Sequence, residues 1–209
     1  MTRPAAGGGR WVTVPPERLA RWLDGFVGRH GDVVAEEVGE TSVRRTAQDG
    51  AVCEVEVPFP PLRGDLVEHA TTPRRVGVLL VRLGGYAAGV FDGPDLVSSK
   101  VGSRQVHGRS AAGGWSQQRF ARRREGQASA ALSAAADTAV RILSPTAASL
   151  DGVVVGGDRG CVDDVLADPR LAAVAALRTG RLLDVPDPRL DVLKAAPFRD
   201  IWIRVVDPA

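Results

Sequence analysis

The chain has 209 residues, of which 44% are hydrophobic and 25% are charged, and its formal net charge is +2. These are ordinary globular values, so we expect one well-buried domain with room for a small annex. No apolar run is long enough to cross a bilayer and no signal peptide is evident, which predicts a soluble, cytoplasmic protein. Cys53 and Cys161 lack the spacing of a zinc site or a disulfide framework, so we expect two buried thiols.

The N-terminal part of the chain is expected to form the annex. Residues 1–10 have the composition of a flexible lead-in. A helical pattern then runs from Pro15 to about Arg29, because its apolar residues recur three and four positions apart. Three short runs typical of β-strands follow, at 33–38, 41–46 and 51–57. The proline-rich segment after them marks a seam, which predicts an annex over residues 1–60 and a main domain over residues 61–209.

The main domain opens with three strand-like runs joined by tight turns. The runs at 76–82 and 86–93 are separated by a double glycine, and a third run at 96–101 follows an Asp-Gly-Pro turn. This order suggests an antiparallel meander that leads into a loop over residues 102–115. Ser116 can cap a helix with one continuous apolar face, which predicts a helix over residues 116–143.

The remainder of the chain alternates strands and helices. We expect strands at 152–155, 181–185 and 201–206, and helices at 160–178 and 188–196, with Pro169 interrupting the first helix. Helices distributed among strands after an opening meander indicate an α/β (α+β layered) domain, in which a sheet is flanked by helices.

Positive charge is concentrated between Lys100 and Glu125. This stretch holds seven basic residues and one acid, a net charge of +6 in a chain whose total is only +2. Its basic residues are Lys100, Arg104, Arg109, Arg119, Arg122, Arg123 and Arg124. Arginines at a helix N-terminus oppose the helix dipole, so a bound anion would compensate them. A nearby double glycine allows close approach of backbone, and the combination is typical of a site for a phosphate polymer.

The run GGWSQQRFAR, from Gly113 to Arg122, resembles the catalytic loop of eukaryotic and archaeal class I peptide-chain release factors. Their motif is glycine-glycine-glutamine, serine, two variable residues, arginine, phenylalanine, alanine and arginine. The similarity is closer to the Vms-like release factors of ribosome quality control, in particular their actinobacterial branch. It covers about residues 75–206 and is weak over residues 1–60. It implies a release-factor catalytic domain with a mixed sheet, flanking helices and a ribonuclease H-like topology.

The resemblance implies hydrolysis of the ester that joins a nascent peptide to tRNA. This reaction needs a positioned water and stabilisation of an oxyanion. Where class I factors have the catalytic glutamine, this chain has Trp115. The quality-control hydrolases shift their glutamine relative to the double glycine, so the role passes to Gln117 first and to Gln118 second. Gly113 and Gly114 would let the backbone approach the tRNA terminus.

The same resemblance implies a set of RNA contacts. Trp115 would stack on a base, and phosphates would be bound by a polar set that also includes Ser116 and His107. The full expected RNA-binding set is Lys100, Arg104, His107, Arg109, Trp115, Ser116, Arg119, Arg122, Arg123 and Arg124. The implied partners are the large ribosomal subunit, through its rRNA, and peptidyl-tRNA. No cofactor, metal or membrane contact is implied, and we expect a monomer that acts independently of codons in ribosome rescue.

Two alternatives stay open from the sequence. Trp115 at the glutamine position also suits a ribosome-binding or tRNA-binding protein without catalysis. Because related folds resemble ribonuclease H, four acids could instead serve a metal-dependent nuclease that acts near the tRNA 3′ end. They are Asp92, Asp137, Asp151 and Asp158. Asp92 and Asp158 adjoin glycine turns, however, where aspartate is favoured for turn chemistry alone.

Overall fold

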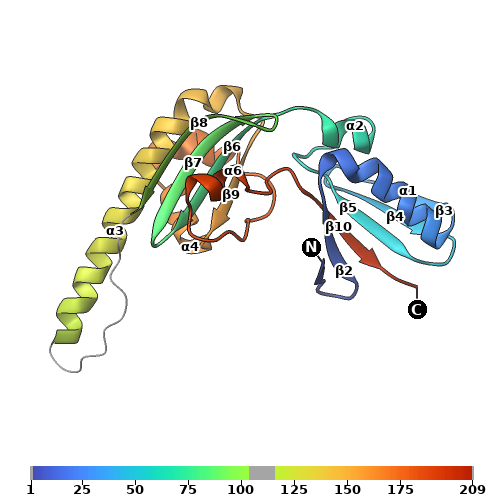
Figure 1. Ribbon diagram of the computed structural model, residues 1–209, viewed down its shortest axis with the longest axis horizontal. Helices are drawn as coiled ribbons and strands as arrows, with labels where there is room; N and C mark the ends of the chain where they lie inside the picture. Colours follow the sequence, from blue (N-terminus) through green and yellow to red (C-terminus); the bar gives the residue numbers. More distant parts are fainter. Residues whose placement is uncertain (1, 104–115, 209) are drawn as a thin grey trace. The chain divides into compact units, whose positions relative to one another are not determined.

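The computed structural model describes residues 2–103 and 116–208, with the course of the backbone alone for residues 116–125 (Figure 1). The chain divides into two compact units. One unit combines Met1–Thr72 with Arg199–Ala209, and the other is Pro73–Phe198. The first unit extends to Thr72, whereas the sequence predicted a boundary at residue 60. The first unit also includes the C-terminal segment, which was expected in the main domain. The last strand pairs there because it finds partners on both sides in that sheet.

The N-terminal unit is built on a six-stranded sheet with the order β1-β2-β10-β5-β4-β3. All its pairings are antiparallel. The strands are β1 (Thr2–Pro4), β2 (Arg10–Val14), β3 (Val33–Val38), β4 (Ser42–Ala47), β5 (Val52–Glu56) and β10 (Ile201–Val206). The prediction of a flexible lead-in over residues 1–10 is therefore wrong in part, because β1 and the start of β2 lie in this segment. Its glycines form the turn of a hairpin, with Gly7, Gly8 and Gly9 at positive φ.

Helices cover one face of this sheet. They are the 3-10 turn η1 (Pro16–Arg18), α1 (Leu19–His30) and α2 (Leu66–Thr71). Leu19, Leu23 and Phe26 of α1 are buried against strand residues such as Val55 and Ile203, which confirms the apolar face read from the sequence. The short helix α2 was not expected. Asp65 caps its N-terminus, because Oδ1 of Asp65 accepts hydrogen bonds from the backbone N–H groups of residues 67 and 68 at 2.8 and 3.0 Å.

The second unit is built on a four-stranded mixed sheet with the order β8-β7-β6-β9. Its strands are β6 (Arg75–Arg82), β7 (Gly85–Asp92), β8 (Asp95–Ser103) and β9 (Gly152–Gly157). The first three form the expected antiparallel meander. β9 pairs in parallel with β6, after a crossover through α3 (Ser116–Leu143) and η2 (Ser144–Ser149). The predicted mixed α/β fold is confirmed.

Both faces of the mixed sheet are covered. One face packs on α3 and on α4 (Arg159–Leu166), with Leu79, Ala88 and Val155 in the buried cluster. Two further short helices, η3 (Pro169–Leu171) and α5 (Ala172–Ala176), follow α4, because Pro169 divides the expected helix. The opposite face is covered by α6 (Leu190–Lys194) and by Phe198, whose ring lies 4.5 Å from that of Phe91. The strand expected at 181–185 is reduced to a single bridge at Leu183.

Candidate functional site

The candidate site lies where β8 passes into α3. β8 is an edge strand that ends at Ser103, and α3 begins at Ser116. Residues 104–115 lie outside the described part of the chain, so the structure does not place Gly113, Gly114 or Trp115. The same holds for Arg104, His107 and Arg109. Lys100 is described, and it lies exposed on β8 opposite Ala88.

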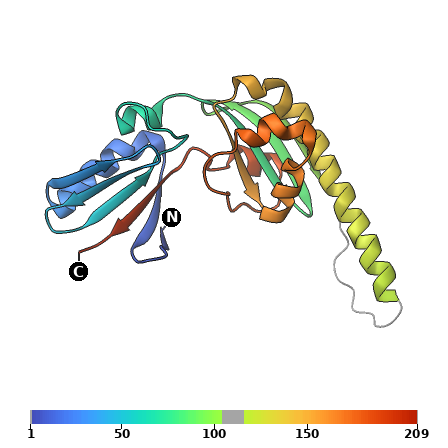
Figure 2. The ribbon, with the colours of Figure 1, turned by 180° about the vertical axis from the view of Figure 1, so that it is seen from behind.

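Helix α3 is longer than the sheet on which it packs. Its 28 residues span about 42 Å, whereas the eight residues of β7 span about 27 Å. Among the α3 side chains that the structure describes, from residue 126 onward, Ala131 is the first buried one, and it lies in the second half of the helix. The first turns consequently project beyond the sheet, as Figures 1 and 2 show. The segment that carries the amide and arginine motif is thus held on a protruding helix.

The helical geometry assigns the motif residues to different sides of α3. Gln117 precedes Ala131 by fourteen residues, which in an ideal helix is about 40° short of four full turns. Arg119 is about 200° from Gln117, and Arg122 and Arg123 fall near Arg119. Gln118 is about 100° from Gln117. The two candidate amides therefore differ in position relative to the arginines.

The base of the loop is held by a contact that the sequence did not reveal. A Cβ placed on Gly102 would lie 2.4 Å from the ring of Tyr86, so the ring covers the glycine closely. Tyr86 also packs against the buried cluster that includes the α3 residues Ala135 and Ala139. Gly102 was expected in the loop, but it belongs to β8. The only sequence signal was the glycine itself, since the partner lies on another strand.

Three of the four acids of the alternative nuclease site have structural partners. Asp137 accepts a hydrogen bond from Arg170 at 2.8 Å, and the Arg75 backbone N–H donates to Asp151 at 2.7 Å. Asp158 lies 3.4 Å from an Arg82 nitrogen. Across residues 2–103 and 116–208, no three His, Cys, Asp or Glu side chains gather in a way that could hold a metal ion. These contacts explain the three acids through local structure.

The two thiols differ in their surroundings. Cys53 is fully buried, and burial raises its pKa to about 11. Cys161 is only half-buried, and its pKa is raised by burial and then by the nearby carboxylates of Asp158 and Asp164. Both environments favour the protonated thiol over the nucleophilic thiolate. The expectation of two buried thiols is met by Cys53 alone.

In the part of the chain that the structure describes, none of the helices combines the length and the apolar character needed to cross a membrane.

Comparison with known proteins finds a family match that covers most of the second unit and the strand β10 of the first. The family model described as Actinobacteria/chloroflexi VLRF1 release factor matches residues 74–206. No curated protein matches the chain. Among solved structures, the archaeal translation termination factor aRF1 is similar at 15% identity with a TM-score of 0.44, over 89% of this chain and 62% of that one. A structure titled "Archaeal protein" is 18% identical with a TM-score of 0.41, over 72% of this chain and 47% of that one.

Proposed function

Because the chain belongs to the VLRF1 release-factor family of Actinobacteria and Chloroflexi, we propose that it releases nascent peptides by hydrolysing peptidyl-tRNA on stalled large ribosomal subunits. Family membership establishes a release-factor-related role in translation and implies interaction with the ribosome. The proposal adds the reaction, the substrate and independence from codons.

The observation that carries this proposal is the position of the motif at the start of a protruding helix. The peptidyl-tRNA ester is surrounded by RNA of the large subunit, so the catalytic group must project from the body of the protein to reach it. The overhang of α3 beyond its sheet supplies such a group with a helical support. The packed second half of the helix, from Ala131 to Leu143, anchors that support in the core.

The proposed reaction divides the motif into two roles. Gln117 orients a water whose oxygen attacks the ester carbonyl carbon, and the bond to the ribose oxygen then breaks. The acyl group becomes a carboxylic acid, and one proton of the water passes to the departing ribose oxygen, which becomes the hydroxyl of the tRNA terminus. Backbone N–H groups at Gly113 and Gly114 face the oxyanion that develops during attack. None of these steps requires an ionisable nucleophile.

The helical positions favour Gln117 over Gln118 for the water. By ideal helical spacing, Arg119, Arg122 and Arg123 fall about 140–240° around the axis from Gln117, and we expect them to bind RNA phosphates. An amide on the other side can then face the ester while the arginines hold the RNA backbone. Gln118 lies nearer to Arg122, at about 40° around the helix axis, and would share the phosphate side.

The test is release of labelled peptide from peptidyl-tRNA bound to isolated large subunits. We expect Gln117→Ala to lower the rate about a hundredfold or more, while subunit binding is unchanged. Gln118→Ala should weaken binding modestly and leave the rate at saturation unchanged. Gln127→Ala is the matched control, because it removes an amide from the same helix about ten residues farther along. Full activity of Gln117→Ala would refute the assigned role.

Trp115 at the glutamine position supports a second candidate, a ribosome-binding protein without catalysis. Product analysis distinguishes it from the hydrolase. Ester hydrolysis frees the peptide and leaves the tRNA intact, whereas a binding protein changes neither. Salt-sensitive binding to the large subunit without any release by the wild-type protein would establish the second candidate.

A further inference from the structure

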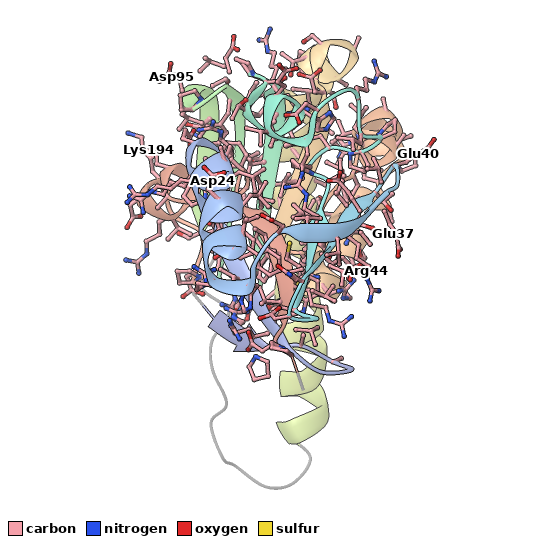
Figure 3. The ribbon with its side chains drawn as sticks, turned by 90° about the vertical axis from the view of Figure 1, so that its right-hand side faces the viewer. Asp24, Glu37, Glu40, Arg44, Asp95 and Lys194 are labelled. Atoms are coloured by element: carbon pink, nitrogen blue, oxygen red, sulfur yellow. The ribbon has the colours of Figure 1, made fainter. Side chains whose placement is uncertain are left out.

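The six-stranded sheet of the N-terminal unit has one packed face and one open face. Side chains alternate along its strands, so that Ile201, Ile203 and Val205 of β10 point into the core while Trp202 and Arg204 point away from it. None of the described residues on this second face is buried. Figure 3 shows Glu37 and Arg44 on the side of the sheet opposite α1, which carries Asp24.

A row of paired residues crosses the open face through all six strands. Each member lies opposite the next in the strand register. From β1 to β3 the row is Arg3, Trp11, Arg204, Glu54, Arg44 and Glu37. On β5, β4 and β3 the charges alternate and offset one another. The β1-β2-β10 end differs, because Trp11 lies between two arginines.

The β1-β2-β10 end of the open face is aromatic and cationic. Trp11 and Trp202 are partly exposed, with ring centroids 6.2 Å apart and planes inclined by 75°. Arg3 and Arg204 flank Trp11, and no acid is present on this face of these three strands. Arg204 is held in place by the carbonyl oxygens of Gly7 and Gly8 and lies 3.9 Å from Glu54.

This combination has the chemistry of a surface for unpaired bases. Indole and guanidinium planes stack on nucleobases, and the cations attract the phosphates between them. Base-paired RNA hides the faces of its bases, so stacking selects single strands. A protein partner would find little flat apolar area here beyond the two indoles, whereas Arg3 and Arg204, the latter shared with Glu54, favour phosphate.

We propose that the open sheet face around Trp11 and Trp202 binds a single-stranded RNA segment, by stacking of bases on the two indoles. The proposal rests on the proposed function only in that it supplies an RNA partner. It assigns to the N-terminal unit a second RNA contact that is separate from the α3 motif. The family match, over residues 74–206, includes β10 of this surface but neither β1 nor β2.

The first experiment uses indole emission from the full chain. Replacing Trp22 and Trp115 with phenylalanine leaves Trp11 and Trp202 as the only indoles among the four tryptophans of the chain. We expect an oligouridine of about a dozen nucleotides to quench their emission. A duplex RNA of the same length should not. Unchanged emission, while anisotropy of a labelled oligouridine shows that it is bound, would overturn the proposal.

The second experiment compares affinities. Trp11→Thr and Trp202→Thr keep a good strand-forming residue on an open face, and each should weaken oligouridine binding about fivefold to a hundredfold. Trp22→Phe, on the opposite side of the sheet, is the control and should bind as the wild type does. Arg3→Glu reverses the charge of an exposed side chain and should weaken binding. Equal affinity in all these variants would contradict the proposal.

The two proposals fail separately. The tryptophan variants should release peptide at the wild-type rate once subunits are saturated, but they should need more protein to reach that rate. Gln117→Ala should retain oligouridine quenching and lose release. If the protein releases peptide but oligouridine does not quench its indole emission, only the proposal for the sheet face is refuted. If oligouridine quenches the emission but no peptide is released, only the hydrolase proposal is refuted.

Discussion

The ring of Tyr86 on β7 lies directly over Gly102 on β8, and it fills the space that a side chain at position 102 would occupy. Gly102 is the last residue but one of β8, so this contact fixes the strand immediately before the basic loop. The tyrosine also packs against the cluster that anchors α3. One ring thus connects the strand that enters the loop with the helix that leaves it.

Gly102→Ala should displace the Tyr86 ring, since the added Cβ would lie 2.4 Å from it. We expect the free energy of unfolding of the second unit to fall by about 1–3 kcal/mol. Hydrogen exchange of the β7 and β8 amides measures the loss locally. Gly126→Ala is the matched control, because no atom lies within 4 Å of its added Cβ and alanine is the better helix former. Equal exchange in both variants would show that the ring moves without cost.

His69→Ala should destabilise the N-terminal unit. The buried imidazole accepts the Arg63 backbone N–H at Nδ1, at 3.1 Å, and Nε2 donates to the Pro58 carbonyl at 2.8 Å. Truncation leaves both backbone groups without these bonds, at a cost of about 2 kcal/mol or more. Denaturant unfolding followed by tryptophan emission reports this unit, which holds Trp11, Trp22 and Trp202. His69→Gln retains a donor and an acceptor and should lose less; a larger loss would mean that ring shape matters more than the hydrogen bonds.

Asp168 should make the second unit sensitive to acid. Hydrogen bonds from the Arg170 side chain, and then from its backbone N–H, lower the pKa of the Asp168 carboxyl from 3.8 to about 2. Since the folded state holds the carboxylate, its stabilising contribution is complete above about pH 4 and is lost as the pH falls toward 2. Asp168→Asn should therefore differ most from the wild type near neutral pH. The free energy of unfolding of both proteins, measured from neutral pH down to about pH 2, tests this expectation. Asp187→Asn is the control for the loss of one exposed negative charge.

The two thiols should react with Ellman's reagent at different rates. Cys161 is half-buried and should react slowly in the native protein, because burial and the Asp158 and Asp164 carboxylates raise its pKa. Cys53 is buried and its pKa is about 11, so it should react only on unfolding. Cys161→Ser should abolish the native reaction. A native thiol that still reacts in that variant would show that β5 opens locally.

Much of the local structure followed from periodic patterns in the chain. The apolar spacing of Leu19, Leu23 and Phe26 predicted α1, and the runs separated by glycine turns predicted the β6-β7-β8 meander. These signals are readable because a helix or a hairpin forms between residues close in sequence. The motif at Gly113 to Arg122 likewise indicated the family, which the match over residues 74–206 confirms.

Pairings between distant segments could not be read in the same way. The strand at 201–206 was expected, but its alternating pattern is satisfied by any sheet edge that buries one face. Only the folded chain places it between β2 and β5, almost two hundred residues from Trp11. That placement created the open face on which Trp11 and Trp202 meet. The sequence by itself determined α1, α3, the meander and the family motif, because these depend on neighbours in the chain. The tertiary structure decided the two-unit division, the Tyr86 contact with Gly102 and the tryptophan surface, because these depend on which distant strands find one another.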